Sequence, residues 1–130
     1  MCFAELIKVN AVLTELNLRG NSIRDDGAKA IAEALKVNPV LTTLGLSENR
    51  IGAEGAKAIA KALKVNPVLT SLDLQTNSIG NGGAMAIAEA LKVNAVLTKL
   101  YLLQGNKMGE AGKKAVRDAV KDRSGFVLEL

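Results

Sequence analysis

The sequence predicts an α/β solenoid, in which short parallel strands form one layer and helices form the other. Three observations predict it. A unit of 28 residues recurs, so that Leu13–Val40, Leu41–Val68 and Leu69–Val96 align without gaps. Each unit begins with LxxLxLxxNxI, whose alternating leucines are typical of a strand. Each continues with an alanine-rich stretch that has apolar residues at helical spacing, and such units bury their apolar faces only by stacking.

The repeat places the expected elements along the chain. We expect strands near residues 15–18, 43–46, 71–74, 99–102 and 127–130. We expect helices near residues 2–9, 25–37, 53–65, 81–93 and 110–122. Crossovers between parallel strands almost always have one hand, which predicts a right-handed arc.

Asparagine and glycine recur at fixed places in the unit. Asn49 stands where the chain must turn, and its amide can bond the backbone of the neighbouring turns. The helices are expected to end at KVN, where asparagine can adopt the left-handed cap, at Asn38, Asn66 and Asn94. A glycine early in each helix predicts close approach between neighbouring units, at Gly27, Gly55, Gly83 and Gly112.

We expect a single domain. It would comprise a partial unit at 1–12, repeats at 13–40, 41–68 and 69–96, a capping repeat at 97–125 and a terminal strand at 126–130. The capping repeat departs from the pattern, because its asparagine, Asn106, stands one residue late. Its helix is also more charged, which suits the polar outer face of a terminal unit.

The repeated segments resemble a known family. Leu13–Ile23, Leu41–Ile51 and Leu69–Ile79, each followed by GAxAIAxAL, are similar to leucine-rich repeats of the ribonuclease-inhibitor-like subclass. The resemblance implies a right-handed leucine-rich repeat solenoid, with a short curved parallel sheet on the concave side and helices on the convex side. The helices are also similar to the repeats of NOD-like receptors. One such architecture binds many unrelated partners, so the resemblance specifies the fold and leaves the partner open.

The composition argues against catalysis and against metal or cofactor binding. The chain has no histidine, which is the usual general base and the commonest transition-metal ligand. Its single cysteine, Cys2, cannot form an internal disulfide or a cysteine–histidine metal site. The adjacent carboxylates Asp25 and Asp26 fit the first turn of a helix, whose dipole favours negative charge. We therefore predict a protein that is not an enzyme and carries no cofactor.

Charge and hydropathy limit the partners and the location. The net charge is +4, but the basic residues are spread along helix faces, and the few aromatic residues leave little to stack nucleic-acid bases. We therefore expect a solvated convex surface and no nucleic-acid or membrane partner. The absence of a visible signal peptide, a long apolar run and cysteine-rich caps predicts a cytoplasmic protein.

The remaining candidate surface is the strand face. Residues between the leucines form columns that vary among the copies while the leucines do not. Variation on an ordered scaffold is what a binding surface shows, and drift on an unused surface is the alternative. Arg19 and Tyr101 are the residue types that anchor interfaces. The candidate partner-binding residues are Glu15, Asn17, Arg19, Thr43, Ser47, Glu48, Ser71, Asp73, Gln75, Lys99 and Tyr101.

The sequence therefore predicts a protein–protein interaction scaffold that binds an unidentified protein partner through its concave sheet face. One alternative is a fragment of the sensor array of a NOD-like receptor. Another is a regulator of a small GTPase or a ribonuclease, in which Arg24 or Arg50 would be compared with the loop arginine of GTPase-activating proteins of the Ran type. The near-identity of the repeats also suits an engineered consensus protein, although the irregular start and the displaced fourth unit argue against it.

The first strand predicts self-association. Only half a helix precedes Glu15–Leu18, so one edge of this strand is expected to lack a partner strand. Two such edges could pair antiparallel in a homodimer, with Glu15 of each copy meeting Arg19 of the other. The alternative is a monomer whose strand edge is hydrated.

Overall fold

The computed structural model describes residues 12–102 and 105–130. Its strands are β1 (Glu15–Asn17), β2 (Thr43–Gly45), β3 (Ser71–Asp73), β4 (Lys99–Tyr101) and β5 (Val127–Glu129). Its helices are α2 (Arg24–Leu35), α3 (Ala53–Val65), α4 (Gly80–Val93) and α5 (Glu110–Val120). This order confirms the predicted alternation of strands and helices, with ends that differ by one or two residues. The helix predicted near 2–9 lies outside the described residues.

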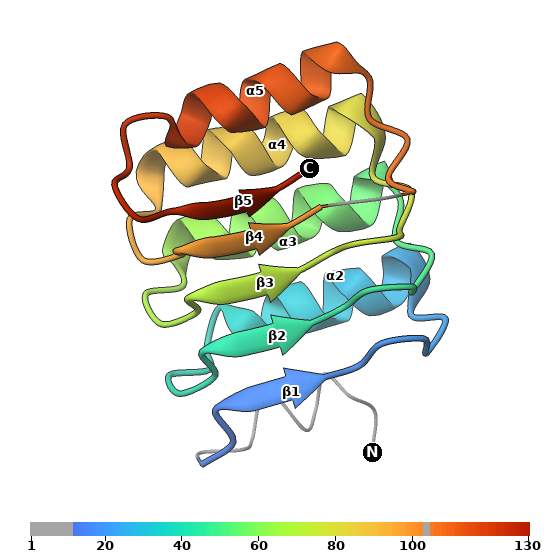
Figure 1. Ribbon diagram of the computed structural model, residues 1–130. Helices are drawn as coiled ribbons and strands as arrows, with labels where there is room; N and C mark the ends of the chain where they lie inside the picture. The colour runs from blue at the N-terminus through green and yellow to red at the C-terminus, as the bar shows by residue number, and fades with distance from the viewer. Residues whose placement is uncertain (1–11, 103–104) are drawn as a thin grey trace.

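The five strands form one parallel sheet in the order in which they occur in the chain, as Figure 1 shows. Leucines at the middle of each strand stand in register, from Leu16 through Leu44, Leu72 and Leu100 to Leu128. The helices α2 to α5 cover one face of this sheet and leave the other face open. The parallel pairing confirms the curved leucine-rich repeat solenoid that the sequence predicts.

The core lies between the sheet and the helices. Leu44, Leu72 and Leu100 are fully buried, as are Ile59 and Ile87 on the helices that face them. Full burial of such a side chain is worth about 1.5–3 kcal/mol. The same positions recur in every unit, so the apolar layer runs without a break along the solenoid.

Close packing of the helices requires the repeated glycines. A Cβ at Gly55 would lie 3.0 Å from the Cβ of Ala28, and one at Gly83 would lie 3.0 Å from the Cβ of Ala56. A Cβ at Gly112 would lie 2.6 Å from Oδ1 of Asn81. These contacts confirm the predicted close approach between neighbouring units at these three glycines. At Gly27 the added atom would instead meet Ile23 of its own loop.

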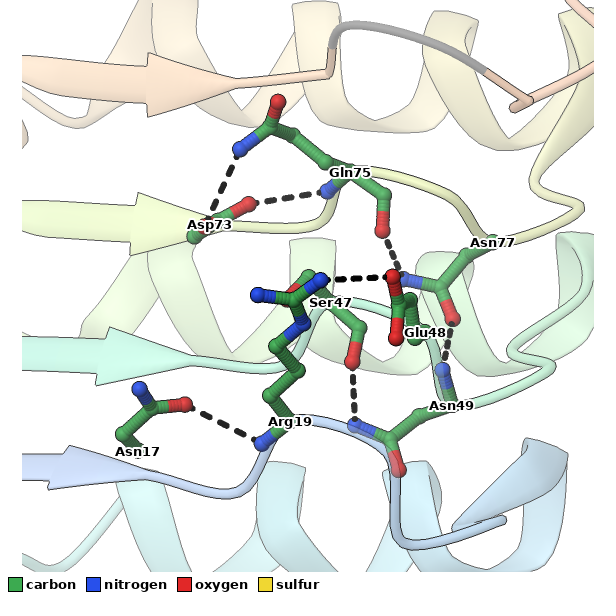
Figure 2. Close-up of polar contacts among 8 residues, drawn as sticks. All are labelled: Asn17, Arg19, Ser47, Glu48, Asn49, Asp73, Gln75 and Asn77. Carbon is green, nitrogen blue, oxygen red and sulfur yellow. Dashed lines mark hydrogen bonds and ion pairs between the residues drawn. The ribbon is translucent and has the colours of Figure 1, made fainter.

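A buried asparagine joins each unit to the one before it. Oδ1 of Asn77 accepts the backbone N–H groups of Asn49 and Ile51, each at 3.0 Å. Nδ2 of Asn77 donates to the carbonyl oxygens of Leu46 and Leu74, each at 3.0 Å. Figure 2 shows part of this ladder, which Asn49 repeats one unit earlier. The expectation that this amide bonds neighbouring turns is therefore confirmed.

The ladder changes at the fourth unit. Nδ2 of Asn106 donates to the carbonyl oxygens of Leu74 and Leu102, but its buried Oδ1 has no partner among the described residues. The donor side of the amide keeps the carbonyl partners that Asn77 has one unit earlier, so only the acceptor side of the ladder differs here. An unpaired buried acceptor costs about 1–3 kcal/mol, so this junction lacks part of the stabilisation of the others.

The predicted left-handed caps at the helix ends are wrong. Asn66 and Asn94 have extended backbone, with φ of −79° and −97°, and Asn38 is not among the residues with positive φ. Their side chains account for the difference. Nδ2 of Asn66 donates at 2.7 Å to the carbonyl of Leu35, the last residue of the preceding helix, and its Oδ1 accepts the N–H of Leu69. The amide thus satisfies a carbonyl that the helix end leaves free.

Arg123 takes the place of this asparagine in the fourth unit. Its guanidinium donates to the carbonyl oxygens of Leu91, Asn94 and Leu97, and it lies 4.8 Å from the centre of the Phe126 ring. Partial burial lowers the pKa of Arg123 from its ordinary value. Five donors on a planar group let one arginine serve several carbonyls at the end of the array.

Polar side chains also cap helices across units. Oδ1 of Asp25, in the first turn of α2, accepts the N–H groups of Gly52 at 2.6 Å and Gly55 at 3.0 Å, at the start of α3. Oδ1 of Asn81 does the same for Gly109 and Gly112 at the start of α5. Asp25 therefore lies in a first turn, as predicted, but it pairs with the neighbouring helix.

The turn after each strand needs a left-handed residue. Gly20 and Gly105 fill this position in the outer units, with φ of 72° and 66°. Glu48 and Thr76 fill it in the middle units, with φ of 56° and 55°. The left-handed conformation costs an L-residue about 1–2 kcal/mol, and it is least suited to a β-branched side chain. The two middle units thus retain strain that glycine would remove.

Within the described residues, β1 pairs with β2 and with no other strand. Residues 1–11 lie outside this description, so the predicted homodimer through the β1 edge stays a prediction. No helix of the described chain has the length and apolar character to cross a membrane.

We predict that Asn77→Ala lowers the free energy of unfolding by about 3 kcal/mol, because it leaves several buried backbone groups unpaired. Urea unfolding followed by circular dichroism measures the change. Asn21→Ala is the matched control, since Asn21 is exposed at the end of the ladder. It should lose less than about 1 kcal/mol. If the two variants lose the same free energy of unfolding, the buried amides do not contribute more stability than the exposed one.

We also predict that Thr76→Gly raises the free energy of unfolding by up to about 1 kcal/mol, because glycine adopts positive φ without strain. The reverse change, Gly20→Thr, should lower it by about 1–2 kcal/mol. Gly20 suits this comparison because a Cβ there would meet no atom within 4 Å, so only the backbone conformation changes. A loss of stability in Thr76→Gly would show that the threonine side chain outweighs the strain.

Candidate functional site on the concave face of the sheet

The open face of the sheet carries a groove of about 700 Å³. Side chains alternate along a strand, so the first and third residues of each strand point away from the buried leucine. The groove gathers every predicted site residue except Lys99, which is exposed on β4. Four further residues line the groove but were not among the candidate partner-binding residues, namely Leu16, Leu44, Gly45 and Thr76.

An ion pair joins the first two units at the groove. Nη2 of Arg19 lies 2.8 Å from Oε1 of Glu48, as Figure 2 shows. This hydrogen bond and the opposite charge lower the pKa of Glu48 and raise the pKa of Arg19. Both side chains are exposed, so the pair contributes little to stability. Its effect is to hold two charged groups in a defined arrangement before any partner binds.

Asn17 and Asp73 occupy equivalent positions on β1 and β3 and form the same local turn. Oδ1 of Asn17 accepts the N–H of Arg19 at 3.0 Å, and Oδ1 of Asp73 accepts the N–H of Gln75 at 2.9 Å. Nε2 of Gln75 also donates to Oδ2 of Asp73 at 3.2 Å. These bonds fix the backbone that leaves each strand and thereby fix the side chains that line the groove.

Gly45 stands between Asn17 and Asp73 in the sheet register. A Cβ at Gly45 would lie 3.0 Å from Oδ1 of Asn17, so the amide occupies the space that a side chain would need. Tyr101 lies beside Asp73 in the register and closes the groove on the β4 side. The aromatic residue that the described part of the chain contributes to the groove therefore neighbours one of its carboxylates.

The groove is polar and carries more acidic than basic groups. Among the residues that the structure describes, three carboxylates line it, from Glu15, Glu48 and Asp73, together with one cation, Arg19. Within the described residues, no group of three cysteine, histidine or acidic residues could hold a metal ion. The chemistry on offer is therefore hydrogen bonding, charge pairing and contact with one aromatic ring.

The sequence analysis did not predict one feature of the site, which is the left-handed backbone at Glu48 and Thr76. The signal was present, because glycine stands at this position in the first and fourth units. Strained backbone persists where the surroundings enforce it, and it gathers at functional sites. Both strained residues line the groove, whereas their glycine counterparts do not.

Comparisons with known proteins identify the domain. The TMOD/LMOD leucine-rich domain, of tropomodulin and leiomodin, matches residues 1–102. None of the curated proteins matches the sequence. The solved structure of leiomodin-1 actin-binding site 2 is similar, with a TM-score of 0.88 and 29% identity over 97% of this chain and 75% of that chain.

The C-terminal domain of Caenorhabditis elegans tropomodulin is a more distant structural match. Its TM-score is 0.57 and its identity is 14%, over 91% of this chain and 89% of that chain, so it supports the fold alone. The resemblance to leucine-rich repeats is thereby confirmed in its broad form. The family match over residues 1–102 shows that the chain belongs to the tropomodulin and leiomodin leucine-rich domain family, whose members are not enzymes.

Proposed function

We propose that this domain binds actin and that the groove on its concave face makes the contact. One observation carries the proposal: 97% of the chain matches a structure described as the actin-binding site 2 of leiomodin-1, with a TM-score of 0.88. A scaffold that is shared over this length presents its loops and inner face in the same arrangement. An actin partner replaces the unidentified protein partner of the sequence prediction and suits a location in the cytoplasm, at the cytoskeleton.

The groove supports a protein partner because its polar groups are already in place. Arg19 is held by Glu48, and Asp73 is held by the backbone and side chain of Gln75. Groups that are ordered before binding lose little conformational entropy when a partner arrives. Tyr101 adds the type of residue that carries much of the energy of protein interfaces. Polar groups around a single aromatic anchor are typical of such an interface.

The alternatives have less support. A fragment of a NOD-like receptor array and a regulator of a small GTPase or a ribonuclease both rest on the resemblance of the repeats. Arg24 and Arg50, the candidates for a loop arginine, have left-handed backbone, with φ of 60° and 58°. Arg24 is the first residue of α2, and Arg50 lies on the loop between β2 and α3. Neither arginine lines the groove. A homodimer through the β1 edge is compatible with actin binding and remains a separate proposal.

The test is cosedimentation with filamentous actin, with fluorescence anisotropy on monomeric actin as a second measurement. We predict that the domain binds and that Tyr101→Ala weakens binding by about 1–2 kcal/mol, or roughly 5–30-fold. Asp73→Ala should also weaken binding, because it removes a fixed carboxylate. The control is the double variant Lys29→Glu and Lys57→Glu on the outer faces of α2 and α3, which should bind as the parent does.

The outcomes separate the partner from the surface. If the parent domain binds neither form of actin at concentrations up to about 100 µM, where contacts worth about 5 kcal/mol would be detected, the actin proposal is wrong. If it binds and only the outer lysine variant loses affinity, actin is the partner but the convex surface makes the contact. Circular dichroism of each variant ensures that a loss of binding is not a loss of fold.

A further inference from the structure

A row of exposed valines runs along one edge of the solenoid, where the helices end and the chain returns to the strands. Val37, Val65 and Val93 are 58%, 61% and 66% exposed. They stand at one position of the repeat, directly after a lysine: Val65 and Val93 are the last residues of α3 and α4, and Val37 lies two residues beyond the end of α2. The corresponding loops stack along the left edge of Figure 1. We call this row the valine ridge.

The valine ridge is wider than three side chains. The loop that follows each valine adds a second, half-buried valine, at Val40, Val68 and Val96. A scattered exposed apolar residue is ordinary, whereas these valines recur at one edge of three successive units, and apolar side chains gathered in this way mark an interaction site. Asp122 stands at the corresponding position of the fourth unit and is exposed, so the ridge ends there. None of these residues lines the concave groove.

The charges beside the valine ridge are unbalanced at its centre. In the first and third repeats, Lys36 pairs with Glu33 at 2.9 Å and Lys92 pairs with Glu89 at 3.0 Å. The second repeat, which lies between them, has Lys61 at the position of these glutamates. Lys61 and Lys64 therefore lie near Val65 as two exposed cations, with no acidic partner within the described residues.

We infer that the valine ridge is a second docking surface, which takes an acidic amphipathic helix of a partner protein. The spacing of the ridge fits a helix laid across it. Packed helices lie about 8–10 Å apart, so neighbouring valines at the helix ends are separated by about that distance. A helix rises 1.5 Å per residue, so apolar residues six or seven positions apart match this spacing. Carboxylates near the middle of that helix meet Lys61 and Lys64.

The same charges disfavour a second copy of this chain as the occupant. A symmetric dimer through the valine ridge would place the same patch of both copies face to face. Lys61 and Lys64 of one copy would then approach those of the other copy across an apolar contact, where like charges repel strongly. An acidic partner is instead attracted by Lys61 and Lys64, whose positive charges a second copy would have to bring close to its own.

The experiment measures fluorescence anisotropy of the whole chain with a synthetic helical peptide of about 21 residues. The peptide carries leucine at every heptad a and d position and mostly glutamate elsewhere. One control peptide has the same composition with the leucine stripe scrambled, and a second has lysine in place of glutamate. We expect the acidic striped peptide to bind at least tenfold more tightly than either control, with an affinity that falls as salt is added.

Variants then locate the contact. Val65→Ser should weaken binding of the acidic peptide at least tenfold, and the double variant Lys61→Glu and Lys64→Glu should do the same. Val127→Ser is the matched control, because Val127 is an exposed valine on β5, away from the valine ridge. Tyr101→Ala, in the groove, should also leave peptide binding unchanged. All substituted positions of the ridge are exposed, and urea unfolding checks that each variant keeps the stability of the parent.

Results of three kinds would overturn the inference. The first is no binding of the acidic striped peptide at concentrations up to the millimolar range. The second is equal binding of the scrambled peptide, or binding that survives Val65→Ser. The third is a concentration-dependent dimer in light scattering that Val65→Ser abolishes, because the occupant would then be a second copy. None of these results depends on actin, so the inference and the proposed function can fail separately.

Discussion

The buried asparagine amide is the interaction on which the rest of this structure depends. Each strand has only three residues, so the sheet ladder satisfies little of the backbone in a unit, and the turns between strand and helix need other hydrogen-bond partners. Asn49 and Asn77 supply an acceptor and two donors at the point where three chain segments meet. An aspartate would lack the donors and a leucine would lack both functions. The amide therefore fixes how one unit sits on the next.

A fixed junction between units sets the positions of the side chains on the concave face. Because each strand keeps its register with its neighbours, the outward side chains form columns whose chemistry can change without disturbing the core. The junction also tolerates the left-handed backbone at Glu48 and Thr76, which costs stability in the two units that form the middle of the groove. Stability supplied by the buried layer thus allows strain at the surface proposed to bind a partner.

The sequence predicts the fold and the composition of the groove well, because both follow from periodicity. A repeat of fixed length places the leucines, and the alternation along a strand then places Arg19, Asp73 and Tyr101 on one face. Contacts between units are harder to predict. Asp25 was expected to stabilise the first turn of its own helix, but its carboxylate accepts a hydrogen bond from the start of α3. Asn66 was expected to cap its own helix through a left-handed backbone, but its side chain bonds the end of the preceding helix. These outcomes depend on distances between units, which a local pattern does not contain.

The two candidate surfaces differ in charge. The groove holds three carboxylates and one guanidinium, whereas the helices and their ends carry most of the lysines. A partner that suits one surface is therefore repelled, or at least not attracted, by the other. The two surfaces share no residue, and the buried layer between them is continuous. In a stack whose units contact only their neighbours, occupation of the groove need not change the helix ends. Under the two proposals, one short domain would therefore hold two different proteins at once.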